Sequence, residues 1–214
     1  AMTPIDFDAR FSRWLHDFLE ENQSDFTDVA QVEAMMPELY ARFVKTPADW
    51  LSGQAPERYF DGQSAEALAA LIVRYEREGV PVPELLLDTI AEKGTRARDA
   101  LVGLIADAGA PRAARMTAIN LLREMDQPPP AELFIAWQLN RELEDELADC
   151  ALESLEAAGE GPLPAMLEAL PQAGEAGQEA LLSVMSRYPD LPGVYEALIR
   201  LFDAAPERTA ALSA

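Results

Sequence analysis

A pair of helix-forming segments recurs about every 30 to 33 residues through the last two thirds of this 214-residue chain. The first segments of successive pairs align at Glu66, Arg98, Ala131, Pro162 and Pro192. A period in this range is typical of proteins built from stacked helical units, each of which buries its apolar face against its neighbours. No segment shows the sustained two-residue alternation that strands require. The pattern therefore predicts an all-α fold.

Start and stop signals divide this array into helices. Proline stands at many predicted starts and glycine at several ends, because proline suits a first helical turn and glycine adopts the left-handed conformation that ends a helix. Ser64 and Gly79, for example, bound the first helix of the array. The helices are expected near residues 64–78, 83–94, 95–108, 111–125, 131–140, 143–158, 162–170, 174–188 and 193–204, with a last one from Pro206.

Aromatic residues are concentrated before the array. Residues 1–60 contain ten of them and the remaining 154 contain six, so the two regions fill their cores differently. Two amphipathic helices are expected in the first region, one carrying Phe7, Phe11, Trp14 and Phe18 on one face and one running from about Asp28 to Phe43.

The region after these helices is rich in turn-forming residues. Pro37 is expected to kink or restart the second helix. Thr46 is expected to cap a short turn that Ser52 and Gly53 close. We therefore divide the chain into an N-terminal helical cap, residues 1–60, and a helical-repeat array, residues 64–214, of about four and a half units.

The second helices of the array carry a resemblance to a known family. The segment from Ala110 to Arg115, followed by Ala118 and Leu121-Leu122, is similar to the proline, arginine, alanine and leucine positions of short HEAT-like repeats of the phycobiliprotein-lyase type. Leu147, Ala151 and Leu155 repeat the spacing. The resemblance covers roughly residues 64–205 and implies a right-handed α-α superhelix whose second helices line a concave surface. It does not imply a lyase reaction, since no motif for one is present.

Composition argues against several functions. A net charge of −21 disfavours binding to nucleic acid or to an anionic membrane surface. The sequence contains no phosphate-binding loop, nucleophile elbow or metal-ligand motif, and His16 and Cys150 are its only histidine and cysteine. We therefore expect a non-enzymatic protein with no cofactor or metal. The absence of a signal-peptide pattern or membrane-span segment predicts a cytoplasmic location.

Charge is segregated along the array. Residues 93–123 carry a local net charge of +4, and residues 127–186 carry −11. At helical spacing, this predicts a strip of basic residues and methionine on one second helix beside an acidic strip on the next. A groove between them is expected to bind a peptide or helix of another protein. The candidate partner-binding residues are Arg112, Arg115, Met116, Asn120, Arg123, Glu146, Asp149 and Glu153, and Glu142 and Glu156 extend the acidic strip.

Three alternatives stay open at this point. The two strips can pair with each other inside the molecule, at about 0–1 kcal/mol for each exposed pair. A small ligand or substrate can bind in a pocket at the junction of cap and array, near Trp50, Tyr59 and Phe60. Opposed charge blocks can also drive self-association. The end of the array near Ala214 has few polar groups to cover a terminal unit, so it is expected either to be truncated or to meet a partner.

Overall fold

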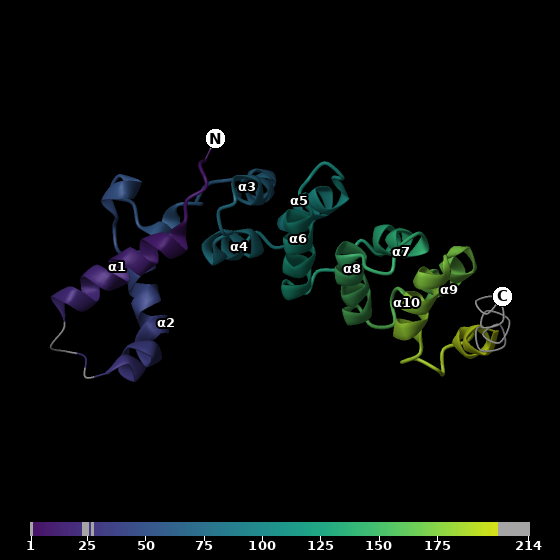
Figure 1. Ribbon diagram of the computed structural model, residues 1–214. Coiled ribbons are helices and arrows are strands. Elements are labelled where there is room, and N and C mark those ends of the chain that lie inside the picture. Colours follow the sequence, from purple (N-terminus) through teal and green to yellow (C-terminus); the bar gives the residue numbers. More distant parts are fainter. Residues whose placement is uncertain (1, 23–25, 27, 201–214) are drawn as a thin grey trace. The chain divides into compact units, whose positions relative to one another are not determined.

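The computed structural model describes residues 2–22, 26 and 28–200, and over these residues the chain is all-α, as predicted (Figure 1). The β-type contact in the described part is an isolated bridge between Ala48 and Gln54. The chain forms two compact units. The first comprises residues up to 104 together with 109–114, and the second comprises residues 105–108 and those from 115 onward.

The first unit begins with two capped helices, α1 (Phe7–Glu21) and α2 (Val29–Lys45). The side chains of Asp6 and Asp28 accept hydrogen bonds from backbone N–H groups in the first turns of these helices. Pro37 lies inside α2, which is one unbroken helix, so a restart there was a wrong expectation. Proline removes only one helical hydrogen bond, and the apolar turn that follows it, with Leu39 and Phe43, is buried.

The chain then makes two short 3-10 helices, η2 (Asp49–Leu51) and η3 (Pro56–Arg58). Thr46 does not cap η2, as the sequence had suggested, but ends α2. Its hydroxyl donates to the Arg42 carbonyl at 2.7 Å, a local bond that a C-terminal threonine makes more readily than a new cap. Ser52 and Gly53 have left-handed backbones and close the turn as expected.

Three further helices follow, α3 (Ala65–Glu78), α4 (Glu84–Ala91) and α5 (Thr95–Ala106), the last of which ends in the second unit. Ser64 caps α3 through the Ala67 N–H, and Gly79 ends α3 with a φ of 66°, both as predicted. Tyr75 in α3 is fully buried, and its hydroxyl bonds to the backbone N–H and C=O of Ile5. This contact fastens the segment before α1 to α3.

The second unit contains most of α6 (Arg112–Glu124), then α7 (Ala131–Leu139), α8 (Glu146–Ala157), α9 (Leu163–Ala169), η4 (Leu170–Gln172) and α10 (Glu175–Met185). Helix α7 packs against α8, α9 and α10, and α10 also packs against α8 (Figure 1). Residues 194–200 are helical, and the rest of the predicted helix 193–204 and the one from Pro206 lie outside the described residues.

Most helix bounds lie within about two or three residues of those predicted, and the start of α8, at Glu146 instead of 143, is at the upper end of this range. The Asp145 side chain accepts a hydrogen bond from the Ala148 N–H and so sets the start of the helix. Glu142 therefore lies in the loop before α8 and is not part of a strip along that helix, as had been expected.

Several contacts join positions one repeat apart. Arg77 donates to the Gly109 carbonyl, 32 residues later, within the first unit. In the second unit, Asn120 contacts Cys150 and Arg123 contacts Glu153, each 30 residues away. Glu156 and Arg187, 31 residues apart, form an ion pair. The separations are close to the sequence period, so these bonds connect each helix pair with the next one along the chain.

Candidate partner-binding surface on the second helices

The predicted basic strip on α6 is not a row of equivalent surface cations. Arg112 at the start of the helix is exposed and belongs to the first unit, whereas the other strip residues belong to the second. Arg115 turns inward: its Nε donates to the Ile105 carbonyl at 2.8 Å, and its guanidinium lies 4.9 Å from the centre of the Trp137 ring. Burial lowers the pKa of Arg115. These contacts fasten α6 to its neighbours, which is a structural task.

Asn120 and Arg123 of the strip contact residues of α8. Met116 and Asn120 are half-buried. The Asn120 carboxamide oxygen accepts from an Arg123 guanidinium nitrogen at 3.0 Å and from the Cys150 thiol at 3.5 Å. Burial raises the pKa of Cys150, so this thiol is poorly activated as a nucleophile.

Two ion pairs connect successive second helices or their ends. Arg123 of α6 lies 3.0 Å from Glu153 of α8, and Glu156 of α8 pairs with Arg187, just beyond α10. We call Arg123, Glu153, Glu156 and Arg187 the ion-pair row. The first pair is the one that the intramolecular interpretation of the charge strips predicts. A partner that uses these charges must therefore compete with, or extend, existing pairs.

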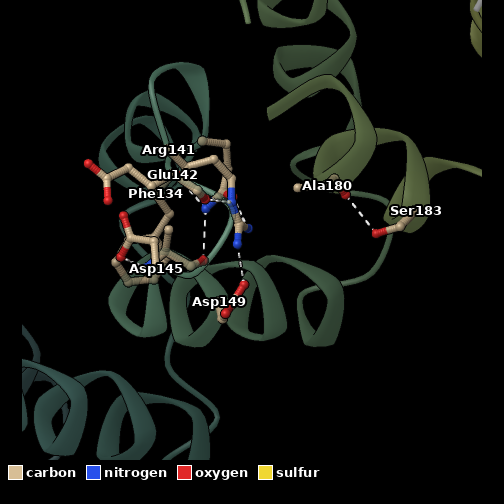
Figure 2. Close-up of polar contacts among 9 residues, drawn as sticks. Phe134, Arg141, Glu142, Asp145, Asp149, Ala180 and Ser183 are labelled. Atoms are coloured by element: carbon tan, nitrogen blue, oxygen red, sulfur yellow. Dashed lines mark hydrogen bonds and ion pairs between the residues drawn. The ribbon is translucent and has the colours of Figure 1, made fainter. Parts of the chain in front are cut away.

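The acidic strip is also engaged at Asp149. Arg141, in the loop between α7 and α8, reaches down to the Asp149 carboxylate (Figure 2). The Arg141 side chain is only 6% exposed, and it also donates to the side-chain oxygen of Gln138 at 3.0 Å. Glu146, the remaining predicted residue, is exposed in the first turn of α8.

Gln138 is the residue that the sequence interpretation missed. It is completely buried in α7, and its amide nitrogen donates to the carbonyls of Phe134, at 3.3 Å, and Ala148, at 2.9 Å. Gln138 and Arg141 thus tie α7, the following loop and α8 together. A signal was present, since Gln138 is the single non-hydrophobic residue between Leu133 and Leu139 and lies three positions before an arginine.

A cavity of about 610 Å³ opens beside the ion-pair row. It lies between the loop that joins α6 to α7 and the junction of α8 and α9, and we call it the triproline cavity after Pro128, Pro129 and Pro130 of that loop. A neighbouring hollow of about 320 Å³ is lined by the whole ion-pair row, Ala157 and Tyr188. The triproline cavity is lined by Arg123, Asp126, Gln127, Pro128, Pro129, Ala131, Glu132, Ser154, Ala157, Ala158, Gly161, Pro162 and Ala165.

The aromatic residues proposed for a junction pocket surround Phe7 instead. The Phe7 ring lies 5.8 Å, between ring centres, from each of Trp50, Tyr59 and Phe60. Phe7 and Phe60 are buried. Trp50 and Tyr59 are half-buried. The three rings pack against Phe7, and a ligand pocket at this place stays a prediction.

No group of three or more metal-ligating side chains converges within the described part of the chain. In the same residues, no helix is both long and apolar enough to cross a membrane. Comparison with protein-family models, with curated proteins and with solved structures finds no match to this chain.

Proposed function

We propose that this chain is a non-enzymatic, cytoplasmic adaptor built as a HEAT-like helical-repeat array, and that it binds another protein through its second helices. In this arrangement α6, α8 and α10 contribute to the concave face of a right-handed superhelix. The bonds between residues about one repeat apart support the stacking that such an array needs, because they join a helix pair to the next one along the chain.

The observation that carries the proposal is the ion-pair row beside two adjoining hollows. Charged side chains and small apolar side chains both line the two hollows. Charges of this kind direct the orientation of a partner and discriminate against wrong ones. Side chains at the mouth of the hollows supply the apolar contact area that affinity requires.

The test is capture of partners from a lysate of the native host with a charge swap at the first pair. The double variant Arg123→Glu/Glu153→Arg keeps an ion pair between α6 and α8 but reverses its direction. We expect one abundant protein to be captured by the wild type and lost with the swap, because the charges of a partner complement Arg123 and Glu153 only in their native positions. Arg115 stays unchanged, since its guanidinium is fastened to Ile105 and Trp137.

Arg13→Glu, on exposed α1 surface in the first unit, is the control for reversing a surface arginine away from the proposed site. It should leave capture intact. Equal capture by the wild type and a folded swap variant would show that the pair is only structural, and the proposed surface would be wrong.

A further inference from the structure

The triproline cavity owes its volume to small side chains opposite a stiff wall. Ala157 and Ala158, where α8 ends, and Ala165 of α9 leave space that larger residues would fill. Across from them, Pro128 and Pro129 have fixed φ angles and no N–H groups to satisfy. A wall of this kind needs little ordering when a ligand binds, so the site is preorganised.

The carboxylates at the cavity make its electrostatic potential negative. Arg123 is already matched by Glu153 at 3.0 Å. Asp126 and Glu132 are exposed and line the cavity, and the described structure shows no cation paired with either. Helix ends do not alter this balance, because α6 and α8 end at the cavity while α7 and α9 begin there, and their dipoles oppose one another. Two uncompensated negative charges therefore flank an apolar floor.

We propose that the triproline cavity binds a basic segment of the partner protein, with a small apolar side chain on the alanine floor and lysine or arginine against Asp126 and Glu132. This inference rests on the proposed adaptor function and specifies the chemistry of the partner. A volume of about 610 Å³ suits a few side chains of one segment. The surrounding residues 127–186, with a net charge of −11, would attract such a segment and repel an acidic one.

Two fluorescein-labelled synthetic peptides provide the probes. They have equal length and the same leucine and alanine positions, and one carries lysine where the other carries glutamate. The variant Asp126→Asn/Glu132→Gln removes both cavity charges without changing side-chain size. Asparagine is the right replacement because Asp126 has a φ of 52°, a left-handed conformation that asparagine tolerates well.

The matched control is Glu144→Gln/Glu179→Gln, two exposed residues that do not line the cavity. Both double variants change the net charge from −21 to −19, so general attraction of a polycation falls equally in the two. We expect the Kd of the lysine peptide, measured by fluorescence anisotropy at fixed ionic strength, to rise about 2- to 30-fold in the cavity variant only.

Equal weakening in the two variants would show non-specific attraction and overturn the inference, as would tighter binding of the glutamate peptide. The proposed function is tested separately by the charge swap. If the Kd of the lysine peptide is unchanged in the cavity variant while the charge swap still abolishes partner capture, this inference fails and the adaptor function stands. If partner capture is also unchanged by the charge swap, both this inference and the proposed function fail.

Discussion

Gly177 allows α10 to approach α7 more closely than any other residue would. A Cβ atom at this position would lie 2.1 Å from the Gln138 carbonyl oxygen and 3.2 Å from the Ala173 Cβ. Real Cβ contacts essentially never fall below 3.0 Å, so Gly177→Ala requires a displacement of at least 0.9 Å (3.0 − 2.1) between backbone segments. The opposing atom belongs to the backbone, and no side-chain rotation can relieve the contact.

The magnitude follows from two opposing effects. Overpacking of a core costs about 1–3 kcal/mol, and a clash with backbone belongs at the upper end. Alanine offsets up to about 1 kcal/mol of this through its higher helix propensity. We therefore expect Gly177→Ala to lower the free energy of unfolding by about 2 kcal/mol. For a chain of this length the midpoint of thermal unfolding should fall by about 4–8 °C.

Gly103 provides the matched control. It also lies within a helix, α5, but a Cβ there meets nothing within 4 Å. Gly103→Ala should therefore stabilise the protein by about 0.5–1 kcal/mol, since only the propensity effect remains. Thermal unfolding followed by circular dichroism at 222 nm compares the two variants with the wild type, and hydrogen exchange at α7 and α10 locates the damage. If Gly177→Ala matched Gly103→Ala in stability, the close approach of α10 to Gln138 would be refuted.

Three further predictions concern other contacts. Burial raises the pKa of Tyr75 to about 12. The unfolded chain therefore loses this proton at a lower pH, and the free energy of unfolding should fall as pH rises from about 10 towards 12. In urea titrations at each pH, Tyr75→Phe should reduce this slope without abolishing it, because burial also raises the pKa of Tyr40. At pH 7 the substitution should cost about 1–3 kcal/mol because the Ile5 backbone groups lose their partner. Arg141→Lys should destabilise the second unit by about 1–3 kcal/mol, since Gln138 and Asp149 are bonded by two different nitrogens of the guanidinium fork and lysine has a single nitrogen. A stability equal to the wild type would argue against that bridge. A double-mutant cycle of Arg123→Ala and Glu153→Ala should give a coupling energy of only about 0.2–1 kcal/mol, because Glu153 is 65% exposed; a coupling of several kcal/mol would contradict this exposed geometry.

Helix ends that depend on neighbouring residues were predictable. Ser64 and Gly79 act within one turn of α3, so their residue types already determine their role. The start of α8 was misplaced for a related reason. Several acidic residues precede this helix, and the pattern alone does not show that Asp145 supplies the cap.

The contacts of Arg115 and Arg123 could not be predicted from the neighbouring sequence. Arg115 and Arg123 lie eight residues apart on the same helix, and both were predicted to bind a partner. In the structure Arg115 packs against Trp137 and the Ile105 carbonyl, whereas Arg123 meets Glu153 on the surface. Residues of other helices determine whether each arginine is packed inside or lies at the surface, and one sequence does not show which helices those are.

The sequence by itself determined that the chain is helical and repeats with a period near 31 residues, because apolar spacing and the proline and glycine signals act over a few residues. Tertiary structure alone decided that Gln138 is buried, that the Phe7 ring packs against Trp50, Tyr59 and Phe60, and that small residues at the α8–α9 junction line a cavity. Burial and open volume depend on the distances between segments remote in sequence, and packing fixes those distances only when the whole unit has folded.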